Sequence, residues 1–429
     1  MPARFRIREI VAAHSTISTQ QLEATHLGQH LKRVGRMHLS DLARPGARVS
    51  IAFTDATRAC PDAVLIGLLI DELTALGVSR EDITLLCATG LHRPMSETER
   101  LLKLGADICH HVRIVDHNAF DAAGLVNLGE IDGLPVVTNR LCVNSDVLIA
   151  TGVVEPHQYA GYSGGAKTVV IGCGGEATIQ ATHSPAMLDH PGTRLGEIEG
   201  NPFQRFVRAA GARIGLHFAL NVVLDESGSI LFAALGSPAS VHDELVAQAR
   251  RLYEVNVPAP AHLALAGVEP VKAVNLYQAS RAATYLALAS NTPLLPGAPI
   301  ILPAPIPEGA GRGAGEQRFF EMLSGAASPA QLVQKMRREG FPAGAQRAYV
   351  LAQVLMQHPI IVVGAERPDV VTACHMLNAP NLDAALVVAQ DIARRQFHLS
   401  VKDWLNYLIV PHALLTLPRL DGQPSKNLV

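Results

Sequence analysis

Short apolar runs alternate with helical patterns along the first half of the chain. The runs predict buried strands, and the stretches between them carry apolar residues at the helical period. The predicted strands are Arg48 to Phe53, Asp82 to Cys87, Val112 to Val115 and Asp146 to Ala150, and the predicted helices are Pro61 to Leu76 and Glu97 to Gly105. This alternation predicts a mainly parallel sheet with helices on both faces.

The first half closes in a hairpin, and the pattern restarts after the proline-rich segment Pro258 to Pro260. The hairpin strands are predicted at Phe218 to Leu224 and Ser229 to Ala234, followed by a helix from Ala239 to Tyr253. Beyond the prolines, strands are predicted at His262 to Ala266, Pro299 to Leu302 and Pro359 to Val363, and helices at Gln278 to Leu288 and Leu382 to Gln396.

These patterns predict two α/β domains with mainly parallel sheets and an active site in the cleft between them. The first domain is predicted to span residues 1–257, and the second residues 258–400. Residues 401–429 are predicted to return to the first domain and to end in a frayed segment from Gly422 to Val429.

Composition and charge narrow the classes of function. Apolar residues make up 48% of the chain and charged residues 17%, which is typical of a globular protein. Because 36 Lys and Arg face 38 Asp and Glu, we expect no nucleic-acid or membrane partner. The first nine residues lack the apolar core of a secretory signal. Six cysteines without a C-x-x-C pair favour reduced thiols in a cytoplasmic enzyme.

Three predicted strands are each followed by a turn and polar residues. The segments are Phe53 to Arg58, Cys87 to Arg93 and Ala150 to His157. In open parallel sheets, ligands bind beyond the carboxyl ends of the strands. The side chains predicted to converge there are Asp55, Arg58, His92, Glu155 and His157.

A glycine-rich loop follows the third segment and ends in Lys167-Thr168. Glycines allow positive φ and close backbone approach, so such a loop can hold an anion such as a phosphate. The stretch from Gly161 to Thr168 nearly matches the P-loop pattern G-x-x-x-x-G-K-[ST], with Ala166 in place of the final glycine. A P-loop follows directly on a strand, whereas Glu155 to Gln158 come between here, so phosphoryl transfer is the weaker alternative.

These residues resemble the nickel-pincer lactate racemases and related 2-hydroxyacid racemases and epimerases. The resemblance runs from Asp55 to about Leu417, and its most specific part is Glu155 to Lys167 followed by His183. It implies that the enzyme inverts the C2 centre of a 2-hydroxyacid. Hydride would pass to and from a nickel pincer nucleotide, nickel pyridinium-3,5-bisthiocarboxylic acid mononucleotide, and two histidines would serve as acid and base. The resemblance also implies that cofactor-building enzymes are partners.

The resemblance assigns a role to each matching residue. Lys167 would carry the cofactor covalently, His183 would bind its nickel, and His92 and His157 would exchange protons with the substrate. The residues implied to bind the cofactor are Asp55, Ala56, Thr57, Arg58, Ser163, Gly164, Gly165 and Lys167. The residues implied to bind the substrate are Arg58, Gln278 and Arg281.

One position departs from the family pattern. Arg281 stands where lactate racemases usually have a lysine, and arginine offers a planar fork instead of a point charge. Lactate is therefore one candidate substrate beside a larger hydroxyacid, a diacid or a sugar acid. A relative that has kept the fold but lost turnover is the alternative from another class, although Arg58, His92, His157, Lys167 and His183 are all present.

Overall fold

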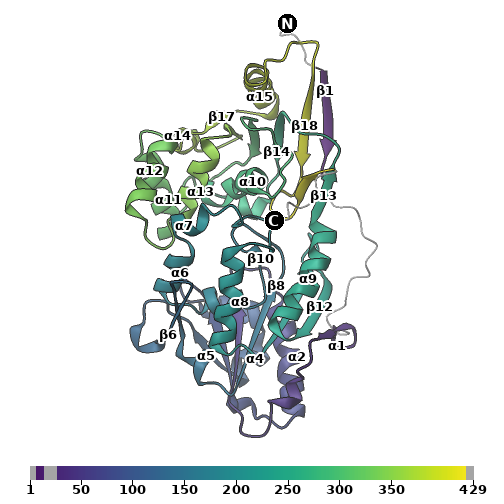
Figure 1. The fold of residues 1–429 in the computed structure, drawn as a ribbon, viewed down its shortest axis with the longest axis vertical. Coiled ribbons are helices and arrows are strands. Elements are labelled where there is room, and N and C mark those ends of the chain that lie inside the picture. Colours follow the sequence, from purple (N-terminus) through teal and green to yellow (C-terminus); the bar gives the residue numbers. More distant parts are fainter. Residues whose placement is uncertain (1–5, 14–26, 422–429) are drawn as a thin grey trace.

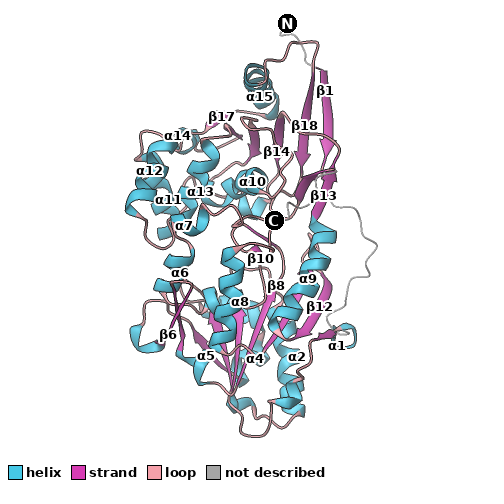
Figure 2. Cartoon of the chain, viewed as in Figure 1, coloured by secondary structure: helices cyan, strands magenta, loops and turns pink. Residues whose placement is uncertain are grey.

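The computed structural model describes residues 6–13 and 27–421 of the 429-residue chain. The described residues form two α/β parts, which lie one above the other along the long axis of the molecule (Figure 1). Helices surround a central sheet in each part (Figure 2). The predicted fold class, two α/β domains with mainly parallel sheets, is confirmed.

The first sheet has its strands in the spatial order β2 (Lys32–Val34), β12 (Ile230–Gly236), β11 (Phe218–Leu224), β8 (Val147–Val153), β3 (Val49–Thr54), β4 (Ile83–Ala88) and β5 (Arg113–Asp116). Neighbouring strands are parallel, except that β11 and β12 pair antiparallel. The predicted hairpin and the four predicted strands are therefore present, with their ends shifted by a few residues.

Burial of both faces of this sheet explains its continuous apolar runs. Along β3, Ile51 and Phe53 share a core with α2 (Asp62–Ala75), whereas Ala52 belongs to the core on the opposite face. Helices α8 (Pro202–Ile214) and α9 (Pro238–Tyr253) cover that opposite face. The shorter elements are α1 (Leu27–His30), α3 (Glu97–Leu104), α4 (Ala106–His111), β6 (Leu125–Ile131), β7 (Leu134–Asn139), α5 (Arg140–Asn144), α6 (Glu176–Thr182) and α7 (Pro185–Leu188).

The second sheet is parallel throughout, in the order β1 (Arg6–Val11), β18 (Trp404–Val410), β14 (Leu263–Ala266), β15 (Ile300–Pro303), β16 (Ile360–Val363) and β17 (Leu377–Ala379). One face packs on α15 (Leu382–Gln396), and the other shares a core with the remaining helices. These are α10 (Leu276–Leu288), α11 (Ala314–Ser324), α12 (Pro329–Glu339), α13 (Gln346–Leu355) and α14 (Pro368–Ala373).

The two ends of the chain follow the predicted domain ranges only in part. Residues 401–429 were expected to return to the first domain, but β18 lies inside the second sheet, between β14 and β1. The first-domain range 1–257 also includes β1, which pairs with β18 at the edge of that second sheet. Nearer the C-terminus, the chain does return to the predicted first-domain range, since β19 (Leu417–Leu420) pairs with β13 (Glu254–Val257). The predicted frayed end, Gly422 to Val429, lies outside the described residues.

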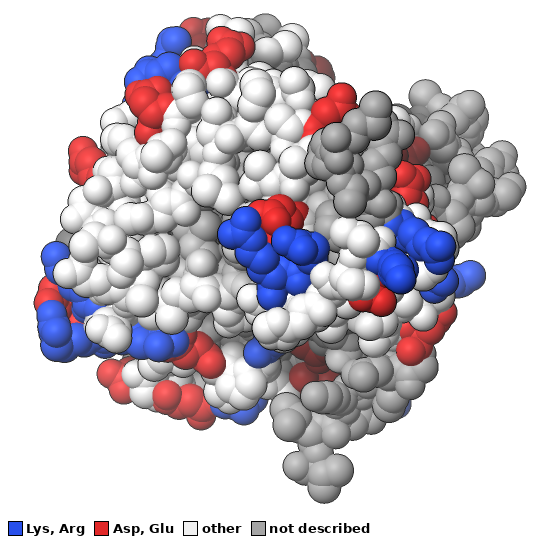
Figure 3. Space-filling model, turned by 90° about the horizontal axis from the view of Figure 1, so that it is seen from above, with Lys and Arg blue, Asp and Glu red and all other residues white. Residues whose placement is uncertain are grey.

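Charged side chains on the face of the molecule seen in Figure 3 lie in small groups, in which basic residues neighbour acidic ones. Broad areas of uncharged side chains separate these groups. This mixture agrees with the nearly balanced charge of the sequence. Among the described residues, no helix combines the length and the apolar character that are needed to span a membrane.

Candidate active site

The carboxyl ends of β3, β4 and β8 open into a cavity of about 300 Å³. The residues that follow these strands form one wall, and α10 with the start of α13 forms the other, so the cavity lies in the cleft between the two sheets. The predicted site residues that line it are Asp55, Thr57, Arg58, His92, His157, Ser163, Gly164, Lys167, His183, Gln278 and Arg281. Strands of one parallel sheet thus bring together side chains that are far apart in the sequence.

The glycine-rich loop turns sharply between β10 (Gly161–Tyr162) and a π-helical turn at Thr168–Gly172. Gly164 and Gly165 have φ of +85° and +56°. Gly161 packs so closely that a Cβ there would lie 1.9 Å from the carbonyl oxygen of Glu197. The loop follows the short hairpin of β9 (Pro156–His157) and β10, not a strand of the main sheet, so the structure differs from a P-loop at the feature that defines one.

Lys167 places its amine in the cavity from the end of this loop. Burial lowers the pKa of the Lys167 ammonium to about 7, and the positive charge of Arg58 adds to that shift. Among the described residues, no carboxylate forms an ion pair with this amine. A large fraction of the amine is therefore neutral at physiological pH, and a neutral amine is a nucleophile.

Chemical labelling of the unloaded protein checks this property. The modification of Lys167 by acetic anhydride is expected to rise steeply between about pH 6 and pH 8 and then level off, because the ammonium form does not react. Exposed Lys402 is the comparison, since ordinary lysine amines stay protonated until about pH 10. Peptide mass mapping measures both. Parallel profiles for the two lysines would show that the Lys167 amine is an ordinary one.

His183 follows α6 and has a fixed, neutral ring. Its Nδ1 lies 2.8 Å from the carbonyl oxygen of Ile179, so Nδ1–H donates there and Nε2 keeps its lone pair. Burial lowers the pKa of His183 to about 4. The rings of Tyr159 and Phe203 meet the imidazole edge to face, each with a centroid distance of 5.3 Å. A neutral imidazole whose second nitrogen is held by a backbone carbonyl is the usual form of a metal-binding histidine.

His92 forms a pair with the buried Asp55. Nδ1 of His92 lies 2.6 Å from Oδ2 of Asp55, and Oδ1 accepts hydrogen bonds from the N–H and the hydroxyl of Thr57. Burial alone would raise the pKa of Asp55, but the hydrogen bonds from His92 and Thr57 hold it below its ordinary value. An ionised Asp55 accepts the Nδ1 proton of the neutral imidazole, which leaves Nε2 free to take up another proton.

His157 is held in the opposite way. Its Nδ1 accepts hydrogen bonds from the N–H groups of Tyr159 and Ala160, at 3.2 and 3.1 Å. The neutral ring therefore carries its proton on Nε2. Burial, with the positive charges of Lys167 and Arg58, keeps the pKa of His157 well below its ordinary value. In this conformation His157 is a hydrogen-bond donor at Nε2, whereas His92 has a lone pair there.

The wall formed by the second domain carries polar atoms without partners. Oε1 of Gln278, Nε of Arg281 and Oε1 of Gln346 are buried, and none of them has a hydrogen-bond partner in the described part of the chain. Buried polar groups are normally hydrogen-bonded, because leaving one unpaired costs about 1–3 kcal/mol. All three residues line the same cavity, which indicates that a polar ligand binds there.

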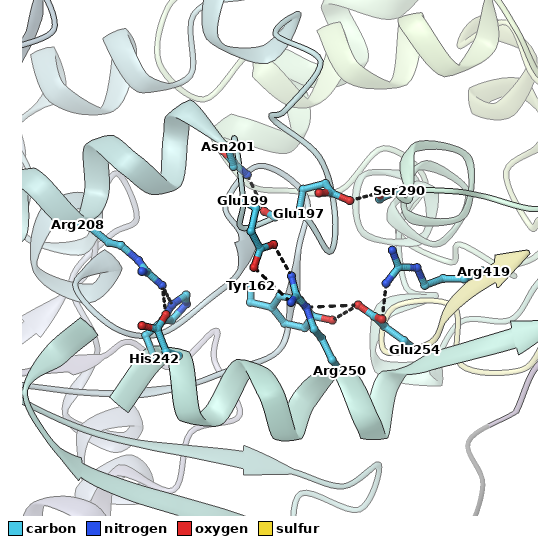
Figure 4. Close-up of polar contacts among 11 residues, drawn as sticks. Tyr162, Glu197, Glu199, Asn201, Arg208, His242, Arg250, Glu254, Ser290 and Arg419 are labelled. Atoms are coloured by element: carbon cyan, nitrogen blue, oxygen red, sulfur yellow. Dashed lines mark hydrogen bonds and ion pairs between the residues drawn. The ribbon is translucent and has the colours of Figure 1, made fainter. Parts of the chain in front are cut away.

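A polar network anchors the glycine-rich loop from behind (Figure 4). The Tyr162 hydroxyl donates a hydrogen bond to Oε1 of Glu254 at 3.0 Å, and Glu254 also pairs with Arg419 of β19. The side-chain amide of Asn201 donates to the carbonyl oxygen of Tyr159 at 2.8 Å. Side chains of β13, β19 and the start of α8 thus hold in place the segment that leads to Lys167.

Three of the predicted cofactor-binding residues have their functional groups elsewhere. Ala56 and Gly165 do not line the cavity; Ala56 is exposed, and the Gly165 N–H donates to Oδ1 of Asn221 at 2.7 Å. Ser163 lines the cavity, but its hydroxyl donates to the Val153 carbonyl at 2.6 Å and accepts from a backbone N–H. Ser163 and Gly165 thus hold the glycine-rich loop in shape, and Ala56 lies in the turn after β3. The motif alone did not show which of the matched residues face the cavity.

Sequence reasoning missed several residues of the second-domain wall. Arg347, Lys272 and Tyr285 line the cavity, yet none follows a predicted strand of the first sheet. Arg347 lies in the first turn of α13, just after Gly344 and Ala345. The available signal was a basic residue in the first turn of a mostly apolar helix. Only the packing of the two domains shows that this residue faces the cavity.

The fold and the cavity together define the class: a two-domain α/β protein whose site lies between its parallel sheets. Residues 6–196 match the model of the lactate racemase N-terminal domain, and residues 265–403 match that of the lactate racemase C-terminal domain. The chain belongs to the lactate racemase family, which confirms the resemblance inferred from the motifs.

Relatives and solved structures agree with this assignment. The chain is 29% identical to the lactate racemase of Thermoanaerobacterium thermosaccharolyticum over 86% of its own length and 85% of the relative's. It is 29% identical to that of Lactiplantibacillus plantarum over 89% and 88%. The lactate racemase apoprotein structure from T. thermosaccharolyticum superposes with a TM-score of 0.83 at 25% identity, covering 98% of this chain and 96% of the other. A Thermotoga maritima protein shares the fold, with a TM-score of 0.67 at 18% identity over 89% and 96% of the two chains.

Proposed function

We propose that this chain is a racemase or epimerase that inverts the C2 centre of a 2-hydroxyacid, using a nickel pincer nucleotide attached to Lys167. The observation that carries the proposal is the gathering, in one cavity, of an unpaired lysine amine with a lowered pKa and three imidazoles in distinct hydrogen-bonding states. The two bacterial relatives are lactate racemases, which supports the proposal.

The side chains present fit the proposed cofactor. Lys167 provides a neutral amine for a thioamide bond, and His183 provides an Nε2 lone pair for nickel. No group of three or more His, Cys, Asp and Glu side chains within the described ranges is arranged to hold a metal, so the proposal requires the cofactor to bring the remaining ligands. When bound, the group supplies an electron-poor ring that can accept the hydrogen of C2 as hydride.

The chain's own residues move the hydroxyl proton and hold the substrate. His92, oriented by Asp55, removes the proton of the C2 hydroxyl through Nε2. Arg58, Gln278 and Arg281 bind the carboxylate through charge-assisted hydrogen bonds, so that the planar ketoacid intermediate stays in the cavity while it turns.

His157 serves the opposite enantiomer in this proposal. Because its Nδ1 accepts from two backbone N–H groups, the ring first stabilises the substrate oxygen as a donor from Nε2. Nε2 can take up the hydroxyl proton only when the ring proton is on Nδ1 instead, and that requires those two bonds to be released. The proton transfer at His157 is therefore coupled to a movement of the loop at Tyr159 and Ala160. The two histidines therefore work from different starting states.

Expression of the chain with cofactor-building enzymes and nickel tests the function. The expected results are a covalent mass gain on the Lys167 peptide and the interconversion of enantiomers of a 2-hydroxyacid, followed by chiral chromatography. A loaded protein that racemises no acid in a broad panel would instead be a binding relative. ATP hydrolysis without a gain on Lys167 would favour phosphoryl transfer. We further propose the cytoplasm, where cofactor-building enzymes would act, as its compartment.

A further inference from the structure

Two guanidinium groups lie on the second-domain wall of the cavity, each against a tyrosine. Arg281 of α10 lies 5.4 Å from the ring centroid of Tyr285, and its Nη2 donates to the Tyr285 hydroxyl at 3.0 Å. Arg347 of α13 lies 4.7 Å from the ring centroid of Tyr277, and its Nη2 donates to the Tyr277 carbonyl oxygen at 2.5 Å. The tyrosines hold both planar groups in place, and α10 packs against α13.

Neither guanidinium has a carboxylate partner among the described residues. The carboxylates that line the cavity are Asp55, which is bonded to His92, and Glu155, which forms no ion pair with either arginine. Burial lowers the pKa of Arg347, and the positive charge of Arg281 acts in the same direction. Two half-buried like charges without an ion-paired carboxylate are costly unless a ligand supplies negative charge.

One substrate carboxylate can pair with only part of this wall. A single carboxylate satisfies one guanidinium fork, and Arg281 beside Gln278 offers one such site. That leaves Arg347, with four N–H groups that donate no hydrogen bond within the described chain. Beside it in sequence, Gln346 has a buried Oε1 without a partner, and its amide can present either an acceptor or a donor.

We infer that Arg347 and Gln346 form a second anion subsite, and that the substrate is a 2-hydroxyacid with a further carboxylate, a 2-hydroxydicarboxylic acid. This inference rests on the proposed racemase function and names its substrate class. The carboxylate next to C2 binds Gln278 and Arg281, and the distal carboxylate binds Arg347. Arg347 acts in specificity and takes no part in moving the proton.

A matched pair of substrates tests the subsite. Malate and 2-hydroxybutyrate have the same number of carbons, and only malate has a second carboxylate. We expect kcat/KM of the loaded enzyme to be higher for malate by roughly 10- to 100-fold, the range of a charge-assisted hydrogen-bonded pair. Arg347→Gln is expected to lower this ratio by a similar factor, and Arg347→Lys by less. Arg338→Gln removes the same charge from an exposed position of α12 and is expected to leave the ratio unchanged.

Binding provides a readout that does not depend on turnover. Succinate and butyrate lack the C2 hydroxyl, so calorimetry on the loaded protein compares a diacid with a monoacid directly. We expect succinate to bind more tightly, and Arg347→Gln to remove the difference. Circular dichroism and the intact mass of each variant show whether it is folded and loaded.

The outcomes separate the subsite from the racemase function. A loaded enzyme that prefers 2-hydroxybutyrate, or a polyhydroxylated acid of equal length, over malate overturns the second subsite and leaves the racemase proposal standing. Loss of the Lys167 mass gain in Arg347→Gln would assign Arg347 to the cofactor phosphate and also overturn it. A chain that gains no mass on Lys167 and turns over no acid contradicts the racemase proposal itself.

Discussion

Replacing Lys167 with alanine is expected to abolish both the covalent mass gain and the interconversion of enantiomers. The amine is the attachment point in the proposed function, and the bound group supplies the chemistry that protein side chains lack. Activity should therefore fall by at least about 10⁴-fold, to the level of the uncatalysed reaction. Intact mass spectrometry and chiral chromatography on the same preparation measure both effects.

Two further variants separate nucleophilicity from charge. Lys167→Arg keeps a cation in the cavity but offers no neutral amine, so it should behave like the alanine variant. Lys272→Ala removes the other lysine of the cavity, which is also half-buried, and should retain the mass gain. A mass gain that persists in Lys167→Ala, or that disappears only in Lys272→Ala, would refute attachment at Lys167.

The sequence predicted the first-domain half of the site well, because local signals encode it. Short stretches of the sequence show the glycines, the lysine that ends the loop and the polar residues after apolar strands. The structure gives these glycines positive φ, as such a loop requires. The rule that ligands bind beyond the carboxyl ends of parallel strands then predicts that Asp55, His92 and His157 share one cavity, and they do. The pairing of Asp55 with His92 required the structure, because it depends on side-chain directions across two strands.

Features that depend on distant contacts were not predictable. β1 and β18 pair although nearly four hundred residues separate them, and no local pattern shows which strands join the same sheet. Arg347 faces the cavity only because α13 packs on α10. The tautomer of His157 follows from two backbone N–H groups in a turn, and residue type alone contains no information about that geometry.

Asp55→Asn is expected to lower kcat by about 10²- to 10⁴-fold while the mass gain on Lys167 remains. Asp55 fixes the proton of His92 on Nδ1, and an asparagine amide can reverse that preference by donating to Nδ1. His92 would then present an N–H at Nε2 and could not accept the hydroxyl proton. For an enantiomer pair, kcat/KM must fall equally in both directions, because the two substrates have the same free energy. Chiral chromatography from each pure enantiomer measures this.

The double variant decides whether the two residues act as one unit. If Asp55 works only through His92, Asp55→Asn combined with His92→Gln should be no slower than His92→Gln alone, because the carboxylate has nothing left to orient. Asp146→Asn makes the same change at an exposed position before β8, and activity should change by less than about twofold. If Asp55→Asn also loses the mass gain, the carboxylate serves cofactor binding instead. If the losses of the two single variants multiply in the double variant, Asp55 and His92 contribute independently and Asp55 does not act by orienting His92.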